Sequence, residues 1–362
     1  MKSTSAKTFS IILFACTLWI LQACKSEKGA EAVPYISVEG KTMGTYYRVT
    51  YADSLNRDFG LEIDELLKEI NMEISTYIDT STISKFNRAS DFIDLGIRYD
   101  GKAPVTKNRH FWACYWKGLE MYQKSGGAFD PTVMPLVNYW GFGYTEHRAV
   151  TKVDSTVVDS LKMLVGLDKV RLEKGAQSLL WKSQPGVELD FSGLGQGYGV
   201  DAIAEFLEGW GIPHYLVDIG GEQRGKGMSP RGTPWRIGIS IPSSEAPKEE
   251  IMTSFPLENL SVNTSGNYRN YYDVDGAKYG HTINPKTGYP ERSALLSATI
   301  FAKECLHADA LATTCMVLGP EKGMALIEQL PEVEAFFIIG TADGKMETKY
   351  TPGLKKHFSN IR

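Results

Sequence analysis

The hydrophobic and polar positions of the amino-terminal third predict strands followed by a helix. Polar and apolar residues alternate over Tyr35–Tyr51, which predicts two strands joined by a turn near Gly40 and Gly44. Apolar residues then recur every three or four positions, which predicts an amphipathic helix over Leu61–Met72. A polar loop that contains Tyr77 follows this helix.

The next stretch predicts two further helices and a hairpin. Thr106–Ser125 reads as an aromatic-rich helix, and we expect its aromatic stripe to be core and not a ligand cage. Ala128–Gly143 combines prolines and glycines in an apolar setting, so it is expected to be neither a plain helix nor a plain strand. Asp154–Val165 predicts a third helix, and Lys169–Leu172 with Leu179–Trp181 predicts a hairpin.

The segment Val187–Trp210 carries the first candidate site. It reads as a short strand ending at Asp190, then four alternating glycines from Gly193 to Gly199, then a helix. Glycines before a helix N-terminus suit a phosphate, although they could equally shape only the corner between strand and helix. The spacing matches neither the Walker A loop nor the GxGxxG dinucleotide fingerprint.

The carboxyl-terminal half predicts three more strands and a last helix. The strands are expected at Tyr215–Ile219, Trp235–Ile241 and Leu295–Phe301, and the helix at Leu306–Leu318. Strands and helices in this irregular order favour an α+β fold over a doubly wound one. We expect mixed, largely antiparallel sheets flanked by helices, in two closely packed lobes.

Two sets of residues in this half are candidates for chemistry. Asp309 and Thr313 stand four positions apart on the predicted last helix, so they share a face and offer the oxygen ligands that magnesium prefers. The alternative is that the helix dipole favours the aspartate and that the threonine bonds to the backbone. His281 lies in a turn-rich loop, where it could be structural or catalytic.

Composition narrows the class of protein. The 362 residues carry a formal net charge of -4, which argues against a nucleic-acid binder. After Cys24, only Cys114, Cys305 and Cys315 remain, which are too few for a disulfide framework and are not spaced for zinc. We expect Cys305 and Cys315 to face the interior.

The first residues predict export and lipid attachment. Lys2 and Lys7 precede the apolar run Phe9–Leu21, which is too short to span a membrane and reads as a signal peptide over residues 1–23. Leu21-Gln22-Ala23-Cys24 resembles a bacterial lipobox, which predicts acylation of Cys24, although the cysteine could be incidental. Residues 24–33 would then form a tether and residues 34–362 the catalytic domain.

Eight segments together resemble one family, the ApbE family of FAD:protein FMN transferases, in the family's order and over nearly the whole mature chain. They are Lys41–Thr45, Ser75–Tyr77, Gly127–Trp140, Leu189–Asp201, Val217–Gly221, Asn263–Tyr268, Tyr279–Pro290 and Ala308–Thr314. The resemblance implies an ApbE-like fold and a Mg²⁺-dependent transfer of the FMN half of FAD to a threonine or serine of a partner protein, with release of AMP.

The resemblance also implies site residues, partners and a location. The metal ligands would be Asp309, Thr313 and the carbonyl of Gly193. The residues around FAD would be Met43, Tyr77, Ala128, Phe129, Asp130, Asp190, Gln196 and Ile283. The acceptors would be subunits of Na⁺-translocating NADH:quinone reductases or related electron-transport complexes, and the enzyme would be lipid-anchored on the periplasmic side of a bacterial envelope.

Several points stay open at this stage. His281 is the candidate base for the acceptor hydroxyl, with Asp309 or solvent as alternatives. Gln196 stands where many family members have lysine, so the affinity for FAD is expected to depend more on the metal. A Mg²⁺-dependent FAD pyrophosphatase and a non-enzymatic flavin-binding lipoprotein are the competing functions. We expect Asp309→Ala to remove activity and to leave the fold intact.

Overall fold

The computed structural model describes residues 33–96, 107–145, 153–174, 178–242, 250–266, 271–274 and 277–357. The predicted signal peptide, Cys24 and nearly all of the predicted tether therefore lie outside the described residues. Within these ranges, no helix has the length and apolar character needed to cross a membrane.

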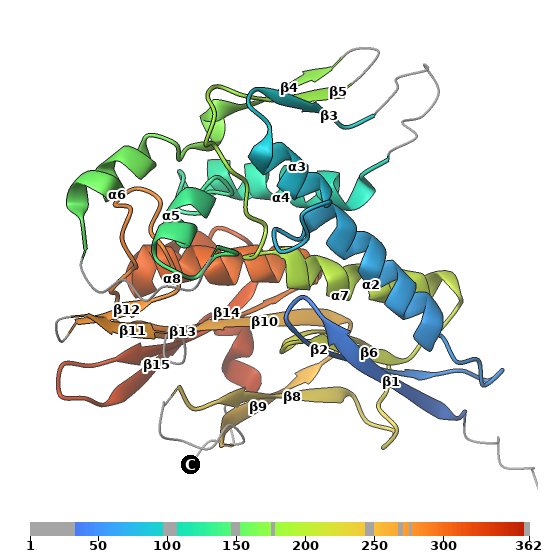
Figure 1. Ribbon diagram of the computed structural model, residues 1–362. Coiled ribbons are helices and arrows are strands. Elements are labelled where there is room, and N and C mark those ends of the chain that lie inside the picture. The colour runs from blue at the N-terminus through green and yellow to red at the C-terminus, as the bar shows by residue number, and fades with distance from the viewer. Residues whose placement is uncertain are drawn as a thin grey trace, which may run out of the picture.

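The centre of the molecule is an eight-stranded antiparallel sheet (Figure 1). Its strands in spatial order are β1 (Tyr35–Thr42), β2 (Thr45–Ala52), β6 (Tyr215–Ile219), β7 (Glu222–Lys226), β10 (Leu260–Gly266), β13 (Leu295–Ala302), β14 (Glu334–Gly340) and β15 (Met346–Tyr350). Strands β1 and β15 are thus the two edges of the sheet, and the middle strands β7 and β10 lie under the pocket described below.

Two layers of helices cover one face of this sheet (Figure 1). Helices α7 (Gly195–Gly209) and α8 (Cys305–Ile327) lie directly on it, and α2 (Gly60–Ile74) and α4 (Arg109–Lys124) pack against them from outside. Helix α8 is interrupted at Gly319, whose φ of 78° is non-helical. Proline at the following position cannot continue the hydrogen-bond ladder, so the two are a sufficient cause of the kink.

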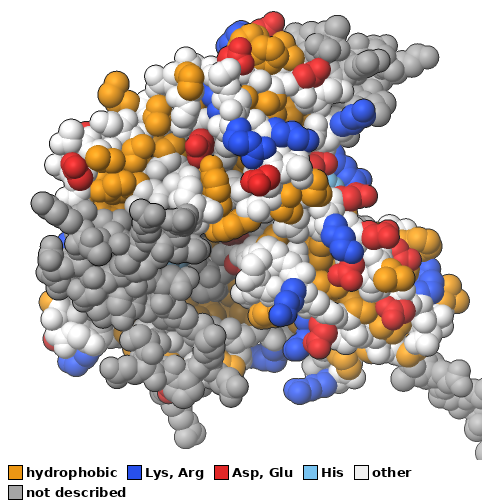
Figure 2. Space-filling model, viewed as in Figure 1, with side chains coloured by type: hydrophobic (Ala, Val, Ile, Leu, Met, Phe, Trp, Pro, Cys, Tyr) orange, Lys and Arg blue, Asp and Glu red, His pale blue; other side chains and the backbone are white. Residues whose placement is uncertain are grey.

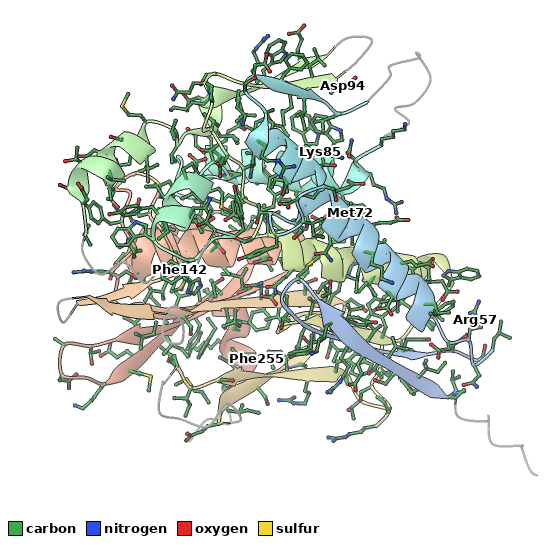
Figure 3. The ribbon with its side chains drawn as sticks, in the orientation of Figure 1. Arg57, Met72, Lys85, Asp94, Phe142 and Phe255 are labelled. Carbon is green, nitrogen blue, oxygen red and sulfur yellow. The ribbon has the colours of Figure 1, made fainter. Side chains whose placement is uncertain are left out.

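The remaining elements extend this arrangement at its edges. They are α3 (Thr82–Arg88), β3 (Phe92–Asp94), α5 (Met134–Tyr139), α6 (Ser155–Lys162), η1 (Leu167–Lys169), β4 (Val170–Lys174), β5 (Ser178–Lys182), β8 (Trp235–Ser240), β9 (Ile251–Leu257), β11 (Tyr271–Val274), β12 (Ala277–Gly280) and η2 (Pro352–His357). Strands β3, β5 and β4 form a small sheet above the helices. The β8–β9 hairpin covers the opposite face of the large sheet, where Phe255 is labelled in Figure 3.

The largest hydrophobic core joins the sheet to both helical layers. It includes Val217 and Ile300 from the sheet, Ile203 and Leu311 from α7 and α8, and Phe111 from α4. The helical part and the sheet part thus share one interior, and the α+β fold with antiparallel sheets is confirmed.

Most predicted elements are present, and one strand is not. The segment Val187–Asp190 forms only an isolated bridge, between Glu188 and Val133. Its backbone is satisfied elsewhere, because the side-chain amide of Asn87 donates to the Leu189 carbonyl (2.9 Å) and accepts from the Leu189 N–H (2.7 Å). The Asn87 side chain thus takes the place of a neighbouring strand on one side, and on the other the Asp190 N–H donates to the Pro131 carbonyl (2.7 Å).

Two other expectations need correction, and one is confirmed. Helix α7 begins at Gly195, so most of the glycines lie inside the helix and not in a loop before it. The segment Ala128–Gly143 is neither a plain helix nor a plain strand, as expected, since only Met134–Tyr139 within it forms the short helix α5. The aromatic stripe of α4 is buried at Phe111, Trp112 and Tyr115, as expected for core, but Trp116 is exposed.

Candidate functional site

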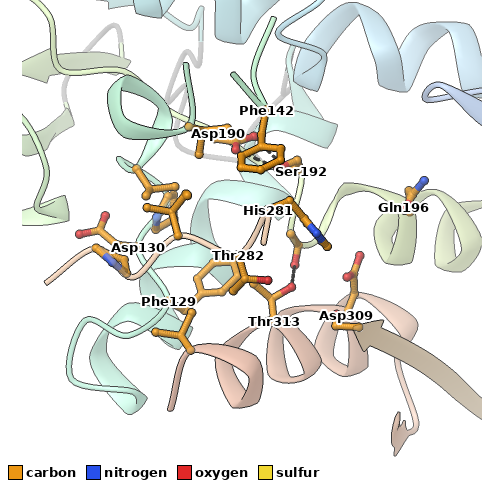
Figure 4. A pocket seen from close by; sticks show the side chains of 18 of the residues that line it. Phe129, Asp130, Phe142, Asp190, Ser192, Gln196, His281, Thr282, Asp309 and Thr313 are labelled. Carbon is orange, nitrogen blue, oxygen red and sulfur yellow. Dashed lines mark hydrogen bonds between the residues drawn. The ribbon is translucent and has the colours of Figure 1, made fainter. Parts of the chain in front are cut away.

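A cavity of about 810 Å³ lies above the middle of the sheet, beside the start of α7 and the first half of α8 (Figure 4). Its volume is within the usual range for small-molecule sites. It is lined by residues that the sequence singled out: Ala128, Phe129, Asp130, Asp190, Gly193, Gln196, His281, Ile283, Asp309 and Thr313. Segments more than a hundred residues apart therefore form one site.

Two predicted FAD-contacting residues lie outside this lining. Met43 occupies the β1–β2 turn with φ of 49° and lies against α7 at Gly199. Tyr77 is largely exposed, and partial desolvation of its hydroxyl together with the charge of Asp190 raises its pKa.

The glycine segment and the last helix meet at the proposed metal ligands. The Thr313 hydroxyl donates to the Gly193 carbonyl over 3.5 Å, a long contact drawn as a dashed line in Figure 4. A Cβ at Gly193 would lie 3.2 Å from the Thr313 side chain, so glycine permits this approach. The carbonyl, the hydroxyl and the buried Asp309 carboxylate one turn earlier on α8 thus face the same cavity.

Two backbone N–H groups at the first turn of α7, which could have bound a phosphate, already have hydrogen-bond partners within the protein. The Gly197 N–H donates to Asp309 Oδ2 (3.0 Å), and the Gly195 N–H donates to the Phe191 carbonyl (2.8 Å). A Cβ at Gly197 would lie 2.5 Å from the Cys305 carbonyl oxygen. The anion at this helix N-terminus is therefore the Asp309 carboxylate, and Gly197 lets α7 and α8 pack backbone to backbone.

Helix α8 is aligned by a residue of α7. Asp201 accepts hydrogen bonds from the backbone N–H groups of Cys305 (3.0 Å) and Leu306 (2.8 Å), which caps α8 from outside. Its carboxylate is also paired with Arg224 at 2.7 Å. Because Asp309 follows one turn later, this cap fixes the position of the carboxylate that reaches the cavity.

Two further polar residues of the cavity region were missed from the sequence. Glu222 begins β7 and lines the cavity, and Asn263 on β10 donates to its Oε1 (3.2 Å). Glu222 Oε2 and Asn263 Oδ1 are buried and have no hydrogen-bond partner among the described residues. Burial raises the pKa of Glu222, and the charge of Asp309 raises it further. The sequence feature that could have pointed to Glu222 was its position just after Gly220-Gly221, at the end of a predicted strand.

Asp130 and Asp190 are each held by a tight local turn. Asp190 accepts from the backbone N–H and the hydroxyl of Ser192 (both 2.8 Å), and Asp130 accepts from the N–H and hydroxyl of Thr132 (2.9 and 2.6 Å). Burial raises the pKa of both carboxyl groups. These hydrogen bonds fix the orientation of each carboxylate at the cavity wall.

His281 and Gln196 also belong to the polar lining (Figure 4). The His281 ring packs edge-on against Phe142, with ring centroids 6.3 Å apart. The Gln196 amide lies beside the β6–β7 turn, where a Cβ at Gly220 would be 3.1 Å from its Nε2. The structure thus brings the candidate base and the lysine replacement to the same cavity as Asp309 and Thr313.

The charge of the lining bears on which ligand fits. Asp130, Asp190, Glu222 and Asp309 are all carboxylates, and none of the described lining residues is lysine or arginine. A diphosphate would be repelled from this cavity unless a cation entered with it. No group of three or more His, Cys, Asp or Glu side chains is arranged for a metal in the described ranges, so a cation would need carbonyl and hydroxyl ligands as well.

Fold and site together define an α+β protein with an acidic cavity, lined by hard oxygen ligands and suited to a cation and a phosphorylated ligand. Comparison with known proteins gives the family. A family model described as the ApbE family matches residues 43–337, and the chain belongs to that family.

Relatives named FAD:protein FMN transferase match along nearly their full length. The chain is 35% identical to the one from Vibrio cholerae serotype O1, covering 94% of this chain and 97% of the relative, and 33% identical to the one from Haemophilus influenzae, covering 97% and 98%. The solved flavin transferase ApbE from Vibrio cholerae superposes with a TM-score of 0.78 at 32% identity, covering 90% of this chain and 100% of that one. The Pseudomonas stutzeri flavinyl transferase ApbE gives 0.77 at 31%, covering 91% and 98%.

Proposed function

We propose that this chain is a Mg²⁺-dependent FAD:protein FMN transferase, which moves the FMN half of FAD to a threonine or serine hydroxyl of an acceptor protein. Membership of the ApbE family and the names of its relatives support the reaction class. The observation that carries the proposal is the approach of Gly193, Asp309 and Thr313 around one cavity large enough for much of a dinucleotide.

The donor set fits a magnesium ion. Asp309, the Thr313 hydroxyl and the Gly193 carbonyl are hard oxygen ligands, and the incoming diphosphate would supply others. When bound, Mg²⁺ would neutralise the diphosphate and polarise the phosphoryl group under attack. The residue at position 196 would supply no positive charge to this neutralisation, because Gln196 is a neutral amide that can only donate hydrogen bonds to the phosphate oxygens.

The other lining residues bind and orient the substrate. Phe129, Phe142 and Ile283 offer apolar surface for the ring systems of FAD, and Gln196 can donate hydrogen bonds to phosphate oxygens. The carboxylates of Asp130 and Asp190 accept hydrogen bonds from ribityl or ribose hydroxyls. Their fixed orientation in the turns at Thr132 and Ser192 makes them suitable for this.

The transfer is a displacement at the FMN phosphorus. The acceptor oxygen forms a bond to that phosphorus, the bond to the bridging oxygen breaks, and AMP leaves with the electron pair. His281 takes the proton of the attacking hydroxyl, since its ring lies in the cavity with Thr313 and Asp309 and imidazole can accept a proton near neutral pH. The product is an FMN phosphoester on the acceptor.

The biological setting is part of the same proposal. The resemblance of Leu21-Gln22-Ala23-Cys24 to a lipobox supports an acyl anchor on Cys24 and a location on the periplasmic side of a bacterial membrane. The acceptors are then threonine-bearing subunits of Na⁺-translocating NADH:quinone reductases or related electron-transport complexes.

The test is incubation of the enzyme with FAD, Mg²⁺ and a threonine-bearing acceptor domain, followed by mass spectrometry. We expect the acceptor to gain one FMN and AMP to appear in equal amount. Release of AMP and free FMN without modification of the acceptor would identify a pyrophosphatase instead. Absence of both products would leave a flavin-binding protein and refute the proposal.

A further inference from the structure

The end of the molecule where the described chain begins is built from three segments. The Pro34 carbonyl accepts a hydrogen bond from the Asp53 N–H (3.1 Å), and the Tyr35 hydroxyl donates to the Met228 carbonyl (2.8 Å). Val33 therefore lies beside the β2–α2 loop and the loop after β7. This end is the lower right of Figure 1, where β1 and the start of α2 meet.

Large hydrophobic side chains are exposed at this end. Leu55 is 70% exposed, Leu61 79% and Trp210 51%, and Val33 and Met228 are about half exposed. Phe59 and Arg57 join Trp210 to the β2–α2 loop, since the Phe59 and Trp210 rings are 5.5 Å apart and the Arg57 guanidinium lies over both. The same loop carries Leu55 and leads into α2 at Leu61, and the hydrogen bonds of Pro34 and Tyr35 bring Val33 and Met228 to this end. We call these five residues the amino-terminal surface. They come from four separate segments, so the chain fold gathers them.

Two ion pairs lie beside this surface, while the exposed carboxylates of Asp58 and Glu62 form no ion pair among the described residues. Arg57 forms an ion pair with Asp53 at 2.7 Å, and Lys226 pairs with Glu208 at 3.2 Å. Figure 2 shows hydrophobic side chains mixed with both acidic and basic ones in this region, and Figure 3 labels Arg57 there. Such a surface does not favour a polyanion. It suits the boundary between lipid headgroups and acyl chains, where a tryptophan and aliphatic side chains are accommodated and net charge is not required.

The length of chain before Val33 indicates what covers the surface. Only nine residue steps separate Cys24 from Val33, so an acylated Cys24 cannot lie more than about 30 Å from Val33. We infer that the amino-terminal surface rests on the bilayer, with Leu55, Leu61 and Trp210 at headgroup depth. This inference rests on the lipid anchor included in the proposed function. The anchor supplies the attachment, and the surface supplies a second contact that sets the orientation.

This orientation would hold the cavity at a defined distance from the membrane surface. Helix α7 runs from Gly195 beside the cavity to Gly209, next to Trp210. A helix of 15 residues is about 22 Å long, at 1.5 Å per residue. If Trp210 lies at the membrane surface, α7 is a rigid spacer that holds the FAD site away from the headgroups, within reach of a domain that projects from the membrane.

The test uses the full-length protein, purified with its lipid and reconstituted into phosphatidylcholine vesicles. A polarity-sensitive fluorophore is attached to Leu55→Cys or, as the matched control, to Met346→Cys. Met346 is also an exposed hydrophobic residue, but it lies on β15 at the opposite edge of the sheet. The described native cysteines are buried, so labelling is selective.

We expect lipids with a nitroxide at shallow depth to quench the label at position 55 at least about twofold more strongly than the label at 346, because interfacial side chains lie at the headgroup and acyl boundary. Adding Leu61→Glu to the Leu55→Cys protein should reduce this difference. Replacing phosphatidylcholine with anionic lipid should not increase the quenching at position 55, since the exposed Asp58 and Glu62 beside Leu61 are acidic.

Three results would overturn the inference. Equal quenching at both positions would mean that no face is preferred. A blue-shifted label at position 55 without nitroxide quenching would indicate a protein contact, such as a second copy of this chain. A mass spectrum without acyl groups on Cys24 would remove the attachment on which the surface depends. Transfer of FMN to a soluble acceptor domain is scored separately, so failure here is distinguishable from failure of the proposed reaction.

Discussion

At the scale of single residues, the cavity depends on carboxylates that are buried and held by hydrogen bonds. Asp309 is the clearest case, because its Oδ2 accepts from the Gly197 N–H in the contact between α7 and α8. Truncation to alanine would leave that buried N–H without a partner, which costs about 1–3 kcal/mol. The expectation that Asp309→Ala leaves the fold undisturbed therefore needs revision, and asparagine is the better substitution.

We predict that Asp309→Asn reduces FMN transfer by about 100-fold or more, since it removes the charged ligand of the proposed cation. The amide oxygen can still accept from Gly197, so the melting temperature should stay close to that of the native protein. Transfer assays on the variant and the native protein test the loss of activity, and thermal unfolding of both tests the unchanged stability. Near-native transfer by Asp309→Asn would show that the metal assignment is wrong.

A second prediction concerns His110, which is outside the cavity. Burial, together with the charge of Arg109, lowers its pKa to about 4 from the ordinary 6.5, and its Nδ1 shares a 2.7 Å hydrogen bond with the Tyr198 hydroxyl. Between these two pH values, the unfolded chain binds a proton that the folded chain does not. The free energy of unfolding should therefore fall as pH drops from about 6.5 to about 4.

The measurement is urea unfolding at several pH values, for the native protein and for His110→Gln. His110→Gln should show a smaller fall in stability over this window, because the residue that takes up the proton is gone. His307 contributes in the same direction, since burial lowers its pKa to about 4 as well. An unchanged slope in His110→Gln would therefore assign the effect to His307 or to other groups.

At the scale of elements, the contact between α7 and α8 positions the site, and its glycines differ in role. A Cβ at Gly197 would overlap the Cys305 carbonyl, whereas a Cβ at Gly209, near the end of the same helix, would meet nothing within 4 Å. We predict that Gly197→Ala lowers stability by more than about 2 kcal/mol and abolishes transfer, because the helices must separate.

Gly209→Ala is the matched control. It should be neutral or stabilising by up to about 1 kcal/mol, since alanine is the better helix former and the space is open. Denaturant unfolding of the two variants gives the comparison. Equal stability of Gly197→Ala and the native protein would mean that close packing of the helices is not needed.

The same elements show which parts of the fold could be predicted. Strands β1, β2, β6 and β13 alternate or run apolar between turn residues, so their local pattern locates them. The start of α7 could not be found in this way, because glycine is a poor helix former and only the contact with α8 explains it. The prediction of a strand at Val187–Asp190 failed for a similar reason, since the Leu189 backbone forms its hydrogen bonds with the distant side chain of Asn87.

At the scale of the whole molecule, FAD and Mg²⁺ should bind together. The described lining has four carboxylates and no lysine or arginine, so FAD alone is repelled and the cation alone has few ligands. We predict that each ligand alone barely changes the melting temperature, whereas both together raise it by roughly 5 °C when in large excess over their dissociation constants.

Thermal shift assays with FAD, with Mg²⁺, with both, and with both plus chelator test this coupling. Asp309→Asn is the control and should lose the joint effect. A full shift with FAD and chelator would show that the cavity binds the diphosphate without a cation. It would contradict the expectation that Gln196, in place of lysine, makes FAD binding depend on the metal.

Residue type and spacing predicted only part of the site, and the family resemblance supplied lining residues such as Phe129, Asp130 and Ile283. Asp309 and Thr313 share a helix face, and the glycines mark a close approach, so these residues were found. Glu222 was missed because a single glutamate after a glycine pair has no characteristic spacing. Its burial and its proximity to Asp309 exist only in the folded chain.

The three described cysteines have a consequence for how this protein matures. Cys114, Cys305 and Cys315 are free, buried and unpaired, and burial raises the pKa of each thiol. Neither thiolate attack nor oxidation proceeds readily from such positions. The described part of the chain can therefore reach its native state without disulfide-forming enzymes, and its stability should be the same in the presence and absence of a reductant.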